Sequence, residues 1–343
     1  MRKTLLIAFA VLLSLPLFGE QKNVKELTGL SDFQLIRAMQ EMADSLGVGC
    51  AFCHIEKDKE LDFPADGKEE KQRAREMIAM VKAANTSTFK GRSTVSCYTC
   101  HRGKNNVTGL VPLPVPAPVA EEHKERPKDL PSVADIVKKY ADAAGNVSRW
   151  ESLRAKGVRE SQEGKQTIPF ELEASHGKFH VVGETPRGKM EQSVGTTEGW
   201  VKAPEPRAMS PRELDLARDQ AAAYQPTDPK DINTTDPKAS RVIGKEKIGD
   251  HEAYVLFTGG GPKARQRLYF DTTSGLLIRR VVLTDSPVGT IPSQTDFEEW
   301  KDVGGTKFPF VVKWSSVDWR NSATRKYSDV TLAAKIEEKV FEK

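Results

Sequence analysis

The sequence predicts an α+β protein of two domains: a small α-helical domain, followed by a curved antiparallel β-sheet, or half-barrel, that also carries helices. Three observations predict this division. Two helix patterns lie within residues 22–104, a proline-rich stretch follows them, and strand-like segments separated by turns make up most of the chain beyond Leu130. The length of 343 residues agrees with two domains, because a single hydrophobic core stops growing at about 250–300 residues.

Composition and charge exclude several classes of protein. Hydrophobic residues make up 38% of the chain, close to the globular average, which argues against a disordered chain or a polytopic membrane protein. The 52 lysines and arginines nearly balance the 48 aspartates and glutamates, and the two signs are interspersed. A net charge of +4 on so long a chain gives no electrostatic reason to expect a nucleic-acid partner.

Residues 1–19 are typical of a secretory signal peptide. Arg2 and Lys3 form a basic start, and residues 4–18 form a nearly unbroken apolar run. The run is short for a membrane span, although its length leaves an uncleaved anchor open. We therefore expect export to the periplasm, with membrane association as an open alternative.

The first helix is expected to begin after Ser31, which stands at an N-cap position with Gln34 as its capping-box partner. Four apolar residues then recur on one helix face: Leu35, Met39, Met42 and Leu46. Gly47 ends this pattern. A second helix is marked by Ala74, Met77, Ile78 and Val81, and stops near Asn85.

Six of the 20 prolines lie between Pro112 and Pro131. Such a stretch is extended and semi-rigid, so it predicts an interdomain linker over residues 111–131. We therefore place a helical domain at residues 22–110 and a β domain at residues 132–343.

The β domain opens with a short helix pattern from Val133 to Ala144, which ends at Gly145, and a second helix is expected from Arg212 to Tyr224. Turn signals separate several of the predicted strands. These strands are residues 168–174, 178–182, 253–257, 267–271, 276–283 and 308–314.

All four cysteines fall in two copies of one motif, C-x-x-C-H. The copies are Cys50-Ala-Phe-Cys53-His54 and Cys97-Tyr-Thr-Cys100-His101. This is the attachment motif of c-type haem: two thiols add across the porphyrin vinyl groups, and the adjacent histidine ligates the iron. With 6 histidines in 343 residues, chance places one after both pairs with odds of roughly 1 in 3,000. The sequence therefore predicts two covalently bound haems, with His54 and His101 as proximal iron ligands.

Three other interpretations of the cysteine pairs remain open. The two pairs could bind one structural zinc ion, each pair could form a disulfide, or either could act as a redox dithiol. None of these needs a histidine directly after both pairs.

The distal iron ligands are expected to be methionines, since a thioether opposite histidine stabilises ferrous iron. A short repeat, Arg-x-Met-x-x-Met, precedes each motif. Met39, eleven residues before Cys50, is the candidate for the first haem, and Met77 is the candidate for the second. Met42 and Met80 are expected to be core residues, with Met80 as a fallback ligand and His123 as a weaker one.

Parts of the chain resemble the cytochrome c subunit of photosynthetic reaction centres. The likeness lies in Ala38-Met39, in the stretch from Ser45 to His54, in Met80-Val81 and in the stretch from Cys97 to Gly103, and covers roughly residues 24–110. The resemblance implies a helix along each haem and matches Met39 to an axial methionine. The family subunit carries four haems, and this chain keeps what looks like the second pair. The resemblance would then make Met77 a replacement for a distal ligand from the missing half.

The C-terminal region resembles the outer-membrane lipoprotein-carrier fold of the LolA/LolB type. The likeness lies in the helix from Asp135 to Ala144, in Gly244–Gly249 and in Arg267–Asp271 with the Thr273–Ile278 stretch. It implies helices across the concave face of the sheet, and either a cavity for acyl chains or another apolar ligand, or a docking platform.

These observations predict an exported dihaem c-type cytochrome that relays single electrons between redox partner proteins, with no catalytic residue. The β domain is expected to dock a membrane complex, a partner or an apolar ligand. Two alternatives stay open: a haem-based peroxidase or sensor with one open iron site, and a lipid or lipoprotein carrier with accessory haems.

Overall fold

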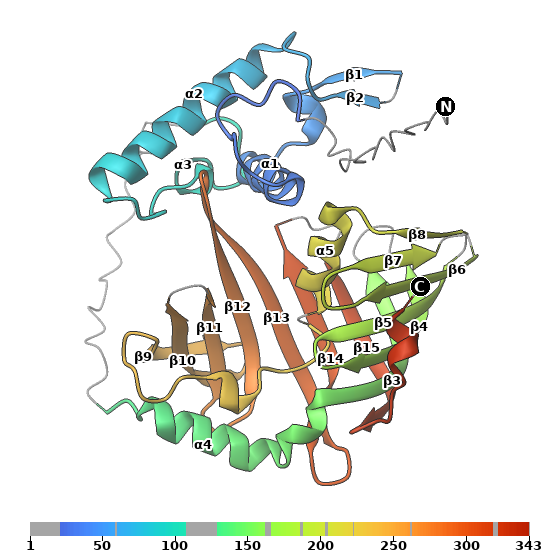
Figure 1. Cartoon of the computed structure of the whole chain (residues 1–343). Coiled ribbons are helices and arrows are strands. Elements are labelled where there is room, and N and C mark those ends of the chain that lie inside the picture. Colours follow the sequence, from blue (N-terminus) through green and yellow to red (C-terminus); the bar gives the residue numbers. More distant parts are fainter. Residues whose placement is uncertain are drawn as a thin grey trace, which may run out of the picture.

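The computed structural model describes residues 21–342, except for residues 59, 108–128, 162–165, 186–187, 203–204, 222, 261–262 and 318–321. The expected signal peptide, most of the expected linker and His123 lie outside the described residues. The described part is α+β: a helical N-terminal region is followed by one large antiparallel sheet (Figure 1). None of its helices has the length and apolar character that a membrane crossing requires.

The N-terminal region is built from three helices and short connecting elements. These are α1 (Asp32–Leu46), a 3-10 turn (Cys50–Phe52), β1 (Ile55–Lys57), β2 (Glu60–Asp62), α2 (Glu69–Ala83), a π-turn (Ala84–Thr88) and α3 (Cys97–His101). The predicted start and end of α1 are confirmed. Ser31 Oγ accepts a hydrogen bond from the Gln34 amide, Gln34 Oε1 accepts one from the Ser31 amide, and Gly47 adopts φ +67°.

The second predicted helix is also confirmed, and it passes into the π-turn beside Asn85. The Asn85 side chain is buried and ties down the chain that returns toward the second cysteine pair. Its Oδ1 accepts from the amides of Thr94 and Val95, and its Nδ2 donates to Val95 O at 2.8 Å. Asn85 therefore fixes the approach to α3.

The sheet has 13 strands in the order β8-β7-β6-β5-β4-β3-β15-β14-β13-β12-β11-β10-β9. Two antiparallel meanders make up this order, and they are joined where the first strand, β3, pairs with the last, β15. The strands are β3 (Ser152–Ser161), β4 (Thr167–Ser175), β5 (Lys178–Thr185), β6 (Gly188–Val194), β7 (Gly199–Lys202), β8 (Pro206–Ala208), β9 (Ser240–Ile248), β10 (His251–Gly260), β11 (Lys263–Asp271), β12 (Leu277–Ser286), β13 (Gly289–Asp302), β14 (Lys307–Ser316) and β15 (Ala323–Leu332).

The predicted half-barrel overstated the curvature of this sheet. The edge strands β8 and β9 do not pair with each other, and the sheet is neither closed nor strongly curled. A strongly twisted sheet of more than about ten strands curls, splits into two packed sheets or flattens, and this sheet stays open. Here α4 (Val133–Ala144), α5 (Pro211–Ala221) and the chain after α5 pack against the sheet and contribute to its core.

The main core lies between the sheet and these helices. Tyr140 of α4 is fully buried, and its ring centroid lies 5.1 Å from that of Phe270 and 6.2 Å from that of Trp150. Its hydroxyl donates to Thr227 O at 2.9 Å. The predicted helix from Val133 to Ala144 is thus the element that closes one face of the core.

The N-terminal region packs onto one end of the sheet. Helix α1 contacts α5 and β13, and the β12–β13 hairpin reaches up to α3 (Figure 1). Arg37 of α1 forms an ion pair with Asp219 of α5, with 2.9 Å between Nη1 and Oδ2. The two regions therefore share a packed interface.

Candidate functional site

The first cysteine motif lies on a tight 3-10 turn directly after α1. The amides of Cys53 and His54 both donate to Cys50 O, at 3.3 and 3.0 Å. These bonds hold the two cysteines and the histidine within a single turn of chain.

The second motif forms the five-residue helix α3. The amide of Ser96, at its N-cap, donates to Thr99 Oγ1 at 3.0 Å. His101 Nδ1 lies 2.9 Å from Lys104 O. Because a carbonyl oxygen only accepts, Nδ1 of the neutral ring carries the proton, and Nε2 keeps the lone pair that an iron ion would use.

A cavity of about 570 Å³ opens between α1, α2 and α3. Its lining is mostly apolar and includes three of the four cysteines and three methionines. The site residues that line it are Met42, Cys53, Met77, Met80, Cys97, Cys100 and His101. The structure thus brings both cysteines and the histidine of the second motif to one cavity with Met77, their expected partner. The fallback Met80 also lines it.

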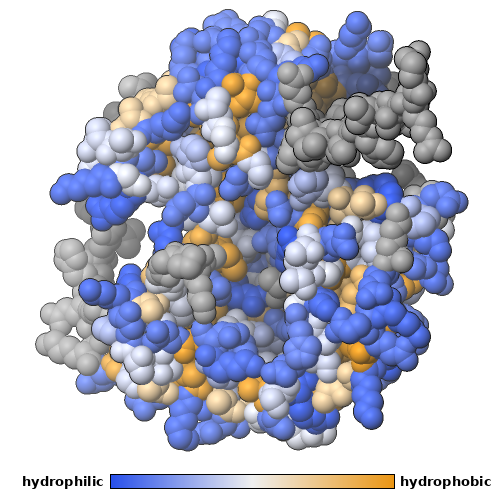
Figure 2. All heavy atoms as spheres, in the orientation of Figure 1, coloured by the Kyte–Doolittle hydropathy of each residue, from blue (hydrophilic) through white to orange (hydrophobic). Residues whose placement is uncertain are grey.

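Apolar side chains at the surface gather in this same region. The four large apolar side chains of the described residues that are at least half exposed all lie in the N-terminal region: Phe63, Met80, Tyr98 and Val107. Figure 2 shows apolar atoms at the surface of this part of the molecule, above a face that is otherwise mostly polar. Met80 and Val107 line the cavity, so an apolar group bound there would shield them from water.

The first motif is arranged differently. Cys53 lies at the cavity, but Cys50, His54 and Met39 do not line it. Met39 is partly buried against the cluster formed by Leu27, Ala38, Ile78, Cys97 and Val288. His54 is 9% exposed, and its Nδ1 has no hydrogen-bond partner among the described residues. The structure therefore does not bring Met39 and His54 to a shared cavity.

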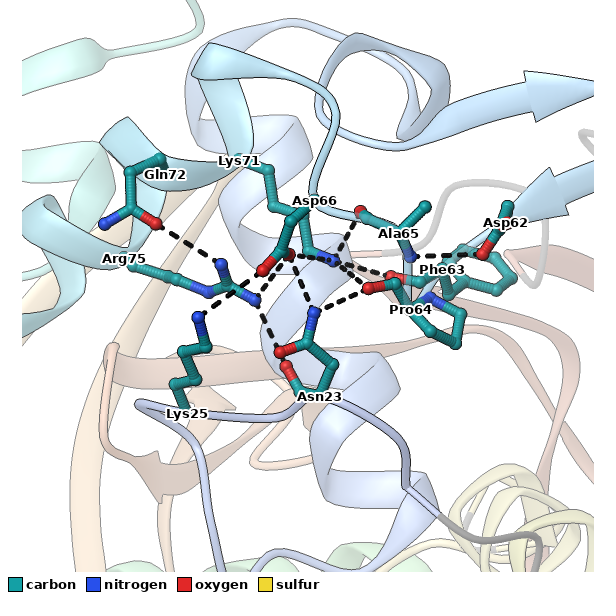
Figure 3. A network of polar contacts seen from close by, with 10 residues as sticks. All are labelled: Asn23, Lys25, Asp62, Phe63, Pro64, Ala65, Asp66, Lys71, Gln72 and Arg75. Carbon is teal, nitrogen blue, oxygen red and sulfur yellow. Dashed lines mark hydrogen bonds and ion pairs between the residues drawn. The ribbon is translucent and has the colours of Figure 1, made fainter.

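A network of charged side chains holds the loop from Phe63 to Asp66 (Figure 3). Lys71 donates to the carbonyls of Phe63, Pro64 and Ala65 at 2.8, 3.0 and 2.8 Å. The Phe63 ring stands edge-on to the His54 ring, with 5.0 Å between centroids. Lys71 thus fixes the backbone that carries the Phe63 ring beside His54.

Asp66 ties Lys71 and Arg75 together. Its Oδ1 accepts from Arg75 Nη2 at 2.9 Å and lies 3.0 Å from Lys71 Nζ (Figure 3). Hydrogen bonds from Arg75, Asn23 and Lys71 hold the pKa of the Asp66 carboxyl well below its usual range. Burial, and then the charge of Lys71, lowers the pKa of His54.

This network was not predicted from the sequence, although the Arg-x-Met-x-x-Met repeat marks Arg75, which belongs to it. Arg37 and Arg75 occupy the same position of the Arg-x-Met-x-x-Met repeat, and both are 9% exposed. Each pairs with a carboxylate, Asp219 and Asp66 respectively. Both arginines of the repeat are therefore buried, and each has a structural role through its ion pair with a carboxylate.

No disulfide joins any two of the four cysteines. Burial is the largest cause that raises the pKa of Cys97 to about 12, followed by the charge of Glu41, and burial also raises the pKa of Cys53. Redox dithiols work through lowered thiol pKa values, and burial shifts the pKa of these two thiols in the opposite direction. No group of three or more His, Cys, Asp or Glu side chains in the described residues is arranged to hold a metal ion, which leaves the shared zinc interpretation without a site there.

A second cavity, of about 1150 Å³, lies in the sheet region. Apolar and charged side chains of both signs line it, among them Trp150, Arg218, Asp228, Lys230 and Leu268. It offers room for a ligand with both polar and apolar parts.

Comparison with known proteins gives matches for the N-terminal region. Residues 19–147 match the family described as photosynthetic reaction centre cytochrome C subunit. Over 96 residues the chain is 34% identical to cytochrome c-554 of Chloroflexus aurantiacus. This matched stretch covers 26% of this chain and 22% of that protein. Over 86 residues it is 34% identical to the photosynthetic reaction center cytochrome c subunit of Rubrivivax gelatinosus. That matched stretch covers 24% of this chain and 22% of that subunit. The matched stretch thus spans 22% of the length of either relative.

The β region is similar in structure to several solved proteins. One is a DUF1329 family protein of Desulfovibrio piger, with TM-score 0.42 and 13% identity over 62% of this chain and 98% of that one. A second is a LolA superfamily protein of Nitrosomonas europaea, with TM-score 0.40 and 15% identity over 62% and 99%. A third is an outer membrane lipoprotein-sorting protein domain of Vibrio parahaemolyticus, with TM-score 0.37 and 14% identity over 60% and 97%.

Proposed function

Since the N-terminal region is a photosynthetic reaction centre cytochrome c subunit domain, we propose that the chain is a c-type cytochrome that carries single electrons between redox partner proteins. It binds two haems, one at each C-x-x-C-H motif. The observation that carries the proposal is the apolar cavity onto which Cys97, Cys100, His101 and Met77 all open.

The residues around this cavity fit a c-type haem. Cys97 and Cys100 would hold the porphyrin through thioether bonds, and Nε2 of His101 and the sulfur of Met77 would ligate the iron, with Met80 as the alternative to Met77. When bound, the haem supplies an iron that cycles between the ferric and ferrous states. The protein's own part is to orient the His101 ring through Lys104 O and to keep water away with the apolar walls.

The first haem would be held by Cys50 and Cys53, with His54 and Met39 as iron ligands. Two features support this assignment. The His54 ring is shielded by Phe63, and its Nδ1 is buried without a partner among the described residues. Met39 is proposed on the resemblance of Ala38-Met39 to the family's axial-methionine position, and it lies within residues 19–147, which match that family.

The chain is proposed to act after export, in the periplasm, as the basic and apolar start of the sequence indicates. The β region would then dock a partner or a ligand. The cavity of about 1150 Å³ supports a ligand role for this region, and its charged lining favours a ligand with a polar group.

The test is direct. The full chain would be matured in a host that attaches c-type haem and digested with trypsin, which releases the first motif in residues 38–57 and the second in residues 93–102. We expect covalent haem on both peptides, and a low-spin spectrum in both oxidation states. Protein without covalent haem would overturn the proposal, haem on one peptide would correct the count to one, and a high-spin haem would favour the peroxidase or sensor alternative.

A further inference from the structure

The β12–β13 hairpin carries a side chain into the core of the N-terminal region. Val288, at the tip between the two strands, is fully buried. It belongs to the same apolar cluster as Ile78 of α2, Ala38 of α1 and Cys97 of the second haem-attachment motif. A residue of the sheet region thus completes the core on which this motif rests.

The next residue, Gly289, approaches the chain just before Cys97. A Cβ at this position would overlap the Cβ of Ser96 and lie 3.1 Å from its Cα. Gly289 also adopts φ +128°, which residues with a side chain rarely adopt. Thr290 Oγ1 then donates to Ser93 O at 3.3 Å, so the hairpin touches the segment from Ser93 to Ser96 at two points.

The tip is internally braced. Ser286 Oγ donates to Gly289 O at 2.8 Å and accepts from the Val288 amide at 3.2 Å. Arg265 of β11 bonds both Asp285 and Thr290, which are bonded to each other. On its other side, the segment before Cys97 is held by Asn85. The approach to α3 therefore lies between two fixed supports.

We propose that the β12–β13 hairpin tip is a positioning element for the second haem, with Val288 and Gly289 setting where Cys97 and α3 stand relative to the cavity. The inference rests on the proposed haem at the second motif. Small shifts of the residues that support a metal site change the potential of the metal. The reduction potential of the second haem, and the completeness of its attachment, therefore depend on a residue in the sheet region.

The experiment compares Gly289→Ala with Gly188→Ala in the full haem-loaded chain. Gly188 also adopts a positive φ, +112°, at the start of β6, but a Cβ there would meet nothing within 4 Å. The control therefore reproduces the backbone strain without the collision. Haem on the two tryptic peptides and both midpoint potentials are measured for each variant.

We expect Gly289→Ala to shift one midpoint potential, or to lower haem on the second peptide, and to leave the first haem unchanged. Gly188→Ala should match the parent chain. The double variant Gly289→Ala with Ser96→Gly, which removes the colliding Cβ, should restore the parent values at least in part, because glycine replaces an N-cap serine at a small cost.

Two sets of results would overturn the inference: an unchanged second haem in Gly289→Ala, or equal shifts in Gly289→Ala and Gly188→Ala. Parent protein without covalent haem on either peptide would instead overturn the proposed function, and parent protein with haem on the first peptide alone would correct the haem count to one and overturn the inference with it. The two failures are therefore distinguishable.

Discussion

Met77 lines the same cavity as Cys97 and His101, although 20 residues separate it from Cys97. Helix α2 places it there because the chain after the helix turns back at Asn85 and returns along α2 to α3. The sequence alone does not fix how Met77 and Cys97 lie relative to each other across this 20-residue gap. In the fold, the buried side chain of Asn85 holds the returning chain in place.

Met77→Ala is expected to lower the midpoint potential of one haem by on the order of 100 mV, because loss of a thioether ligand removes stabilisation of ferrous iron. Redox titration of the haem-loaded chain measures this. Met39→Ala is the matched variant and should lower the other potential. If both variants shift the same potential, or if Met77→Ala shifts neither, Met77 is not the distal ligand.

Glu41 gives the N-terminal region a dependence on pH. It is 6% exposed, and burial raises the pKa of its carboxyl from about 4.5 to about 7, while Ser45 Oγ, which donates to it at 3.1 Å, opposes this rise. The folded chain therefore binds this proton more tightly than the unfolded chain. The free energy of unfolding should fall as pH rises from 4.5 to 7, and stay level above that.

Glu41→Gln cannot ionise, and should be more stable than the parent chain above pH 7 by about 2–3 kcal/mol, with little difference near pH 4. Urea unfolding of both chains at the two pH values measures this difference in the free energy of unfolding. Asp142→Asn, at an exposed carboxylate of α4, is the control and should change neither value. A parent chain whose stability is the same at pH 5 and pH 8 would contradict the account of Glu41.

At the scale of elements, the apolar pattern of the sequence predicts the strands whose buried face is apolar. The six predicted strands are β4, β5, β10, β11, β12 and β14, and each carries a run of apolar residues. Seven strands of the 13-stranded sheet were not predicted. In two of them, β13 and β15, the buried positions include polar residues: Ser293 and Thr295 in β13, and Arg325 in β15. A period of two is visible in a sequence only when the buried face is apolar.

The cysteine motifs and the helix caps could be predicted because both are local patterns. The role of Val288 could not, since it lies 191 residues from Cys97 and its own neighbours form an ordinary turn. The cavity and the network around Asp66 likewise join segments that only the fold brings together.

Val288→Ala is expected to destabilise the chain by about 2 kcal/mol, because it deletes two buried methyl groups and leaves a cavity beside Cys97. Thr284→Ala, at an exposed position of β12, should have little effect. Urea unfolding of both variants measures the difference. Equal midpoints would mean that the hairpin tip does not contribute to the N-terminal core.

At the scale of the whole molecule, the N-terminal region and the sheet are joined by the hairpin tip and by Arg37 and Asp219. The side chains of this ion pair are 10% and 22% exposed. Burial raises the pKa of Asp219, although Arg37 opposes the rise. Arg37 therefore favours the charged form of this carboxylate at the interface, and so does the charge of Arg280.

Because the two regions share this interface, they should unfold together. Haem absorbance reports on the N-terminal region, and far-UV circular dichroism in the β range reports on the sheet. In the parent chain, we expect the two signals to give one coincident urea transition.

Arg37→Met removes one charge of the pair and leaves Asp219 without its partner, which costs about 3 kcal/mol for a buried pair. The haem signal should then change at lower urea than the sheet signal. Adding Asp219→Leu should restore much of the loss, since an apolar pair can replace a buried ion pair at little cost. Lys138→Ala, which breaks an exposed pair with Asp142, should leave both transitions in place.

If the parent signals separate and Arg37→Met moves neither, the N-terminal region folds independently of the sheet. The potential of the second haem should then be insensitive to the β12–β13 hairpin.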